Sequence, residues 1–244
     1  MQYIRADDPL AIAAAAAIHT GSVSALKRLL EENPGLAAAR IGDDANGMSR
    51  TLLHMATDWP GHFPRAAATV AALVESGADV NARFSGPHTE TPLHWAASSD
   101  DVDALDALID AGADLEAPGA VIGGGTPLAD ATAFAQWKAA NRLVERGART
   151  TLWDAATLGL MDRLEGYLGV AEPLTPDEVS RAFWGACHGG QQLTARYLLN
   201  HGAAVNWIPP WEGLTPLDAA RRSGADELVE WLRGQGGRRA DELS

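Results

Sequence analysis

The chain has 244 residues, of which 46% are apolar and 21% charged, and this composition excludes intrinsic disorder and collagen-like structure. Its 32 acidic side chains outnumber its 19 basic ones, and a formal net charge of -13 argues against a surface that binds nucleic acid or anionic lipid. The single cysteine, Cys187, leaves no partner for an intramolecular disulfide and no multi-cysteine metal site, so we expect a reducing, cytoplasmic location.

The N-terminal segment contains an apolar run, LAIAAAAAI, from Leu10 to Ile18. A secretory signal carries a positive segment before such a run, whereas Arg5, Asp7 and Asp8 together are negative. Nowhere else does the chain hold the roughly 18 consecutive apolar residues that a membrane span requires. We therefore expect neither a signal peptide nor a membrane partner.

A repeated unit organises most of the chain. Each clear copy starts with threonine, then proline or leucine, then leucine. These copies begin at Thr51, Thr91, Thr126 and Thr215. In the last three copies a glycine lies twenty-one residues after the threonine, and in the first copy the glycine comes five residues later. The additional residues of that copy lie in segment 59–64, WPGHFP. Such a fixed spacing indicates a repeat architecture.

Weaker copies start at Thr150 and Arg181, and a degenerate one spans Ile12 to Asn33, which makes about seven units. Proline after the threonine suits a first helical position, and the closing glycine suits the left-handed residue that ends a helix. Apolar residues at helical spacing fill the second half of each unit. Each unit is thus predicted to be a helix pair, which must stack on its neighbours to bury its apolar face.

The runs TPLHWAA from Thr91, GADVNA from Gly77 and GADLEA from Gly112 resemble the ankyrin repeat. The resemblance implies an all-α solenoid of stacked helix-loop-helix units, whose projecting loops and first helices form a concave binding face. It implies interaction rather than catalysis. We expect one ankyrin-repeat array over residues 1–236 and a disordered tail over 237–244. The use of arginine in place of lysine is typical of a bacterial protein.

Positions four and eight after the threonine lie one helical turn apart and hold the candidate binding residues. Position four holds Trp95, Asp130 and Asp154, and position eight holds Trp59 and Phe134. A carboxylate pair between aromatic walls suits a cation, a basic side chain or a polar small molecule. The alternative is that the two aspartates face solvent or cap a neighbouring loop, while the tryptophans fill gaps between units.

The segment NWIPPWEG contains a second candidate site, with Trp207 and Trp211 on either side of two prolines. Prolines stiffen a loop and reduce the entropy that is lost when it binds. Rigid aromatic side chains on such a loop are typical binding anchors. Alternatively, each tryptophan packs on its own helix pair.

The histidines do not have the close helical spacing of zinc ligands, so no metal and no cofactor are expected. His54 and His94 occupy the same place in two units, where we interpret them as structural residues that steady a loop.

Two functions remain open at this point. The first is a module that binds a protein or peptide through an acidic, aromatic concave face, with a basic partner favoured by the net charge and a small-molecule ligand also considered. The second is a cofactor-independent isomerase, cyclase or hydrolase in which Asp130 and Asp154 act as acid and base. The second requires loops that close over both aspartates and a raised pKa at one of them.

Overall fold

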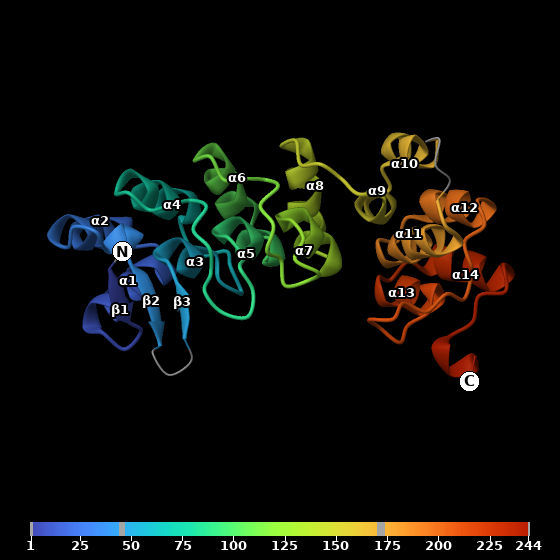
Figure 1. Ribbon diagram of the computed structural model, residues 1–244, viewed down its shortest axis with the longest axis horizontal. Helices are drawn as coiled ribbons and strands as arrows, with labels where there is room; N and C mark the ends of the chain where they lie inside the picture. The colour runs from blue at the N-terminus through green and yellow to red at the C-terminus, as the bar shows by residue number, and fades with distance from the viewer. Residues whose placement is uncertain (1, 44–46, 170–173, 244) are drawn as a thin grey trace. The chain divides into compact units, whose positions relative to one another are not determined.

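The computed structural model describes residues 2–43, 47–169 and 174–243. The described chain is built from pairs of α-helices, with a small sheet near the N-terminus (Figure 1). It divides into two compact units, unit 1 (residues 1–148) and unit 2 (residues 149–244), and each is described by itself. The expected single array over residues 1–236 therefore stays a prediction.

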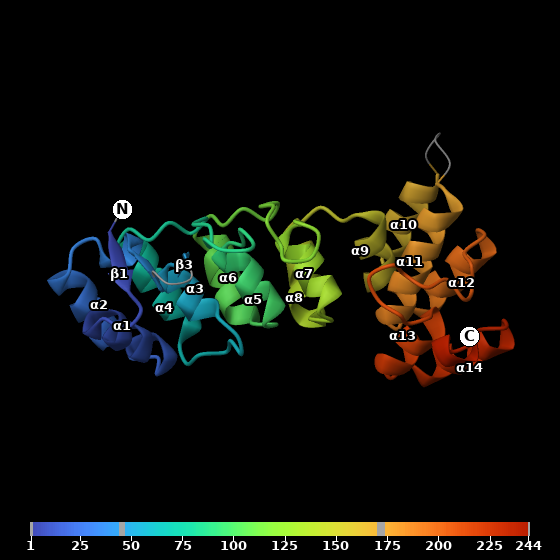
Figure 2. The same cartoon turned by 60° about the horizontal axis from the view of Figure 1, so that its bottom comes forward.

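Unit 1 contains four helix pairs, which follow one another in chain order (Figure 2). First helices contact first helices, α1 with α3, α3 with α5 and α5 with α7, and second helices contact second helices. Alanines such as Ala96 and Ala131, both fully buried, allow this close approach. The pairs are α1 (Pro9–His19) with α2 (Val23–Glu32), α3 (Leu52–Thr57) with α4 (Ala66–Glu75), α5 (Pro92–Ser98) with α6 (Val102–Asp110), and α7 (Pro127–Ala133) with α8 (Trp137–Glu145).

A three-stranded sheet also belongs to unit 1, and the sequence did not predict it. Strand β2 (Arg40–Asp43) pairs in parallel with β1 (Tyr3–Arg5) and antiparallel with β3 (Met48–Arg50), and a short 3-10 helix, η1 (Leu36–Ala38), precedes β2. Ile4 and Ile41 lie opposite each other in the register, and both are buried. Strands of three or four residues are too short to show an alternating pattern, which is why sequence analysis missed them.

Helix starts follow the predicted signals. Thr51, Thr91 and Thr215 have extended backbones and cap the helices that follow them, each with a reciprocal bond to the third helical residue. Proline is the first helical residue after Thr91 and Thr215. Gly112 closes α6 with a φ of 92°, a left-handed conformation that favours glycine. These local signals explain why the repeat boundaries are readable from sequence.

Unit 2 contains three helix pairs around a core that includes Phe183 and Trp184. Helix α11 packs against both α9 and α13. A Cβ atom at Gly189 would lie 1.9 Å from the backbone oxygen of Thr157, so glycine is what allows α11 to lie so close to α9. The pairs are α9 (Leu152–Leu158) with α10 (Met161–Leu168), α11 (Pro176–His188) with α12 (Gln192–Asn200), and α13 (Pro216–Arg222) with α14 (Asp226–Gly234).

The C-terminal segment differs from the expected disordered tail over 237–244. Its described residues bond back to unit 2 and end in a 3-10 helix, η2 (Ala240–Glu242). The amide of Arg238 donates to Asn206 Oδ1 at 2.7 Å, and the amide of Ala240 donates to Asp218 Oδ2 at 2.9 Å. Side-chain acceptors in the preceding repeat thus order a segment that has no apolar periodicity of its own. Ser244 lies outside the described residues.

Candidate functional site

Trp59 lies on the insertion between α3 and α4, and it is 80% exposed. The insertion is fastened to the next helix pair, because the amide of His62 donates to Asp101 Oδ2 at 2.6 Å and His62 Nε2 lies 3.0 Å from Ser99 O. Phe63 also stacks on His19, with ring centroids 4.5 Å apart. Trp59 is therefore an exposed aromatic side chain on an anchored loop, as a binding residue should be.

Trp95 and Phe134 lie on α5 and at the end of α7. Trp95 is half-buried against Phe84 and His54, with ring centroids 5.6 and 4.9 Å away. Phe134 is 43% exposed, and no ring contact joins it to another aromatic side chain in the described part of unit 1. The binding roles of Trp95 and Phe134 remain predictions.

Asp130 is fully buried on α7, and neither of its carboxylate oxygens makes a hydrogen bond within the described residues. Burial first, and the negative charge of Glu90 second, raise the pKa of Asp130 to about 8. Glu90, which sequence analysis did not single out, is itself bound by the amide of Val121 at 2.9 Å and lies 3.1 Å from His88 Nδ1. The raised pKa suits an acid catalyst, but a side chain without exposed surface offers nothing for a substrate to reach.

Asp154 has a structural partner, and its place in the repeat differs from the expected one. Thr151, not Thr150, caps α9, so Asp154 is the third helical residue rather than a position-four residue. Its Oδ2 accepts from the Thr151 amide at 2.8 Å and from Thr151 Oγ1 at 2.7 Å. Asp130 and Asp154 belong to different units. The predicted role of this aspartate pair in binding or catalysis stays a prediction, and the bonds to Thr151 tie Asp154 to the start of its own helix.

Four tryptophans gather in unit 2, and we call them the tryptophan cluster: Trp153, Trp184, Trp207 and Trp211. Trp153 and Trp184 stack with ring centroids 5.8 Å apart. Trp211 meets the edge or face of all three others at centroid distances from 5.8 to 6.4 Å. Both predicted loop tryptophans thus join the same cluster, which spans α9, α11 and the loop before α13.

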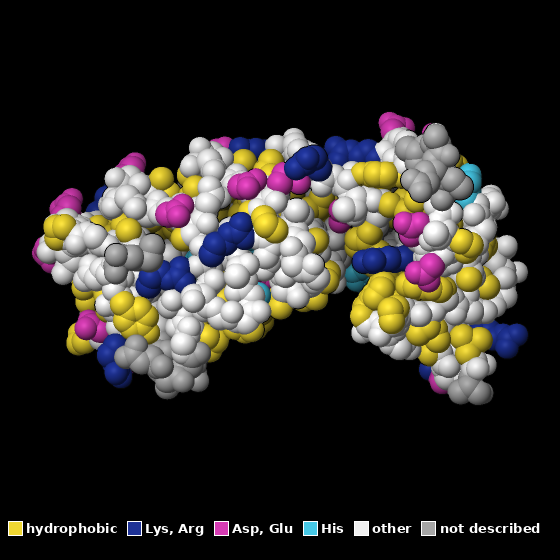
Figure 3. Space-filling model, in the orientation of Figure 1, with side chains coloured by type: hydrophobic (Ala, Val, Ile, Leu, Met, Phe, Trp, Pro, Cys, Tyr) yellow, Lys and Arg dark blue, Asp and Glu magenta, His cyan; other side chains and the backbone are white. Residues whose placement is uncertain are grey.

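The cluster combines buried and accessible rings. Trp184 is 2% exposed, and its Nε1 donates to Leu214 O at 2.9 Å. Trp207 Nε1 donates to Asp177 Oδ1 at 2.9 Å, whereas Trp211 is 52% exposed. In Figure 3, hydrophobic side chains lie together with a basic one on this part of unit 2, over α11 and α13. The cluster therefore has a fixed base and an open aromatic surface.

Two arginines flank the rings. The guanidinium carbon of Arg181 lies 5.1 Å from the Trp211 ring centroid and 5.8 Å from that of Trp153. Arg222 lies over Trp184 at 5.7 Å and forms an ion pair with Glu212. Such cation–π contacts hold a guanidinium in a defined place.

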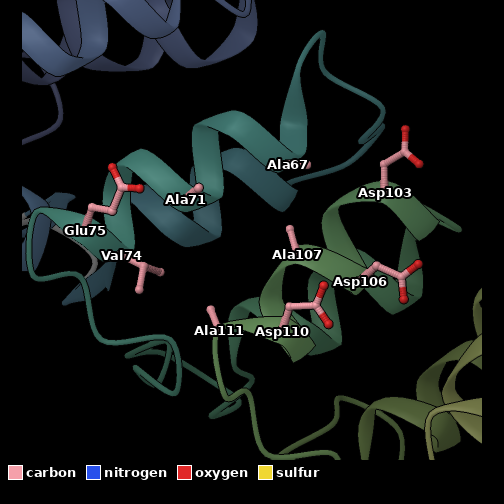
Figure 4. Close-up of a pocket in the computed structure, with 9 residues that line it drawn as sticks. All are labelled: Ala67, Ala71, Val74, Glu75, Asp103, Asp106, Ala107, Asp110 and Ala111. Carbon is pink, nitrogen blue, oxygen red and sulfur yellow. The ribbon is translucent and has the colours of Figure 1, made fainter.

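A separate groove of about 550 Å³ lies between α4 and α6 (Figure 4). Alanines line it on both helices, and carboxylates stand at its edges. One of these, Asp106, accepts from Arg142 Nε and Arg146 Nη1, both at 2.8 Å. None of the predicted site residues is among the residues that line this groove.

The comparisons with known proteins agree with this repeat geometry. Residues 88–120, which span helix pair α5 and α6, match the family model of the ankyrin repeat. These residues form an ankyrin repeat. Among solved structures it is similar to the human ASB11 ankyrin repeat domain, with a TM-score of 0.52 and 21% sequence identity over 92% of this chain and 97% of that one. No curated protein matches the sequence.

The ankyrin fold explains His54 and His94, which the structure confirms as structural residues. The Thr91 amide donates to His94 Nδ1 at 3.1 Å, and His94 Nε2 lies 3.3 Å from Gly125 O. Because an amide N–H only donates, Nδ1 is the unprotonated nitrogen and Nε2 donates to the carbonyl. Burial lowers the pKa of His94 to about 4 and that of His54 to about 3. Within the described residues, no three histidine, cysteine or carboxylate side chains gather as metal ligands would.

Trp153 and Arg181 are the residues of the cluster surface that sequence analysis missed. In the four clearest repeats, which start at Thr51, Thr91, Thr126 and Thr215, the second residue after the cap is a buried leucine, as at Leu93 and Leu217. Trp153 takes that position in α9, and Gly185 on α11 leaves room for it, since a Cβ there would lie 3.1 Å from Trp153 Cε3. A tryptophan in place of leucine, followed by glycine in the next repeat, is the signal that would have identified the cluster.

None of the described helices has the length and apolar character needed to cross a bilayer.

Proposed function

We propose that the protein is an interaction module whose tryptophan cluster holds a peptide segment of a partner protein. The supporting observation is the surface in unit 2, where Trp211 is 52% exposed and contacts three other tryptophans. Ankyrin-repeat arrays are in general interaction modules, and exposed aromatic rings on a rigid base are typical anchors of such interfaces. We place the module in the cytoplasm, as the lone buried cysteine favours.

Unit 1 offers further contact residues under the same proposal. Trp59 and Phe134 are exposed and free to touch a partner, and Trp95 offers part of its ring. Asp130 and Asp154 contribute through the structure of their repeats, because both carboxyl groups are buried.

The experiment selects peptides from a phage-displayed library of random dodecapeptides on the immobilised full chain. Selected peptides are expected to bind the native protein and to lose about tenfold or more in affinity with Trp211→Ala, since loss of a central aromatic anchor has an effect of this size. Binding is measured by fluorescence anisotropy of labelled peptides. Leu193→Ala is the control, because Leu193 is a 75% exposed apolar residue on α12 outside the cluster.

Two results would contradict the proposal. One is selection of peptides whose affinity Trp211→Ala leaves unchanged, which would place binding elsewhere. The other is a failure to enrich any peptide over the unselected library in repeated rounds. Thermal unfolding of each variant shows whether it folds like the native protein.

A further inference from the structure

We propose that Arg181 determines the specificity of the tryptophan cluster, and that it selects peptide segments in which an acidic side chain stands next to an aromatic or aliphatic one. This inference rests on the proposed function and adds the chemistry of the partner. It comes from the combination of one accessible guanidinium with the aromatic surface around it.

Arg181 is exposed on α11, and its guanidinium lies over Trp153 and Trp211. No carboxylate of the described residues forms an ion pair or hydrogen bond with it. Asp177, one helical turn earlier, accepts from Trp207 Nε1 at 2.9 Å instead. The guanidinium is therefore positioned by aromatic rings, and its N–H donors have no acceptor from the described chain.

Arg222, the other arginine of the cluster, differs from Arg181 because it has a carboxylate partner within unit 2. Glu212 forms an ion pair with it, and its second nitrogen lies 3.3 Å from His188 Nδ1. Its charge is thus balanced within unit 2. Arg181 is consequently the cation of the cluster that remains available to a partner.

The chemistry of a guanidinium defines what binds there. A guanidinium that lies over a ring keeps the donors at its edge free, and their planar arrangement fits a carboxylate with two parallel hydrogen bonds. The side chain is already held by two rings, so less conformational entropy is lost on binding. An apolar side chain beside the carboxylate is then covered by the exposed surface of Trp211.

The acidic character of the whole chain opposes an acidic ligand only weakly at this site. Unit 2 has 13 acidic and 9 basic residues, so most of the net charge of -13 belongs to unit 1. At physiological ionic strength, charges beyond about 8 Å are largely screened. A contact between a carboxylate and Arg181 is much shorter, so the local cation decides the preference.

The test compares the peptides that different variants enrich from the random dodecapeptide library on phage. We expect the native protein to enrich clones with Asp or Glu beside an aromatic or aliphatic residue. Arg181→Gln is expected to lose the acidic preference while still enriching apolar clones. Arg196→Gln is the matched control, since Arg196 also lies over a tryptophan, Trp231 at 5.0 Å, elsewhere in unit 2.

Affinities of synthetic peptides make the test quantitative. For the consensus peptide, replacement of its acidic residue by the neutral amide should weaken binding to the native protein about tenfold. The same replacement should change binding to Arg181→Gln very little, because the interaction has already been removed. Arg196→Gln should behave like the native protein.

Three results would overturn the inference. They are an equal acidic preference in the native protein and in Arg181→Gln, enrichment of basic peptides, and binding only from a second library that displays free C-terminal carboxylates. In each of these cases Trp211→Ala still weakens binding about tenfold or more if the proposed function holds. Failure of the proposed function is recognised separately, because Trp211→Ala then has no effect.

Discussion

The third helical residue of the repeat is a buried polar side chain that bonds the capping threonine in several units. His54, His94 and Asp154 are each the third helical residue, and each accepts a bond from the capping threonine. The histidines also reach the following repeat through Nε2, and the aspartate accepts from both the amide and the hydroxyl of Thr151. Either an imidazole nitrogen or a carboxylate oxygen can therefore accept the bond from the capping threonine at this position.

Asp130 is a buried polar residue that has no such partner, so we expect it to lower the stability of the protein at high pH. Its pKa is 3.8 in the unfolded chain and about 8 in the folded one. Between these values the folded state retains a proton that the unfolded state releases, so the free energy of unfolding falls as pH rises. Asp130→Asn removes this loss and should stabilise the protein by at least about 1 kcal/mol near pH 8, with a smaller gain near pH 4.

Urea unfolding of both proteins at about pH 4.5 and about pH 8.5 measures the effect. Asp162→Asn, at an exposed residue of α10, serves as the control for the loss of a surface carboxylate. A gain from Asp130→Asn that does not depend on pH would show that Asp130 is not protonated in the folded protein.

At the scale of helices, unit 2 depends on glycines that let α11 approach α9. Gly189→Ala places a methyl group 1.9 Å from the Thr157 backbone oxygen, and a backbone atom cannot move away without shifting the helix. We expect a loss of about 1–3 kcal/mol in the free energy of unfolding. The loss is measured by chemical unfolding followed by circular dichroism.

Gly166→Ala is the matched control for this substitution. Gly166 lies inside α10, and a Cβ there meets no atom of the described residues within 4 Å. Alanine is the better helix former, so this variant should gain up to about 1 kcal/mol. Equal effects of the two substitutions would mean that the close approach of α11 to α9 is not required for stability.

The helix pairs could be predicted from sequence because their boundaries depend on neighbouring residues. Threonine before a helix and glycine after it act within one turn, so the clear repeats follow from local signals. Helix α1 instead begins after Asp8, and α11 begins at Pro176, before the expected start at Arg181. The adjacent threonines Thr150 and Thr151 made the start of the fifth unit ambiguous, and the one-residue error placed Asp154 on the wrong face. The short strands were missed because three or four residues are too few to show an alternating pattern, and because the partner of β1 lies far along the chain.

The proposed binding surface was only partly predictable for the same reason. Trp207 and Trp211 were recognisable because the two prolines between them are local signals. Arg181 was not, because its role depends on rings from α9 and from the loop before α13. Glu90 was missed because its effect on Asp130 exists only once two helix pairs have packed.

For the molecule as a whole, the excess of acidic residues is a source of electrostatic repulsion. Unit 1 carries 19 acidic and 10 basic residues, and unit 2 has the smaller excess. Repulsion within a compact charged unit lowers its stability, and salt screens it. We expect the melting temperature to rise by a few degrees, roughly 2–4 °C, between about 10 mM and about 150 mM NaCl.

Calorimetry in NaCl and in KCl separates screening from specific ion binding, because screening gives the same rise with both salts. A melting temperature that falls with added salt would mean that the surface ion pairs outweigh the repulsion between like charges.

The carboxylate of Asp106 has a consequence for how unit 1 comes apart. Repeat arrays are held by contacts between neighbours alone, so the last helix pair of a unit has only one neighbour within it and opens most easily. Here Arg142 of α8 and Arg146, which directly follows that helix, both donate hydrogen bonds to Asp106 on α6, and Arg146 also forms an ion pair with Asp110. Opening of the last pair must therefore break a charge network as well as an apolar contact. The final repeat of unit 1 therefore unfolds cooperatively with the repeat before it.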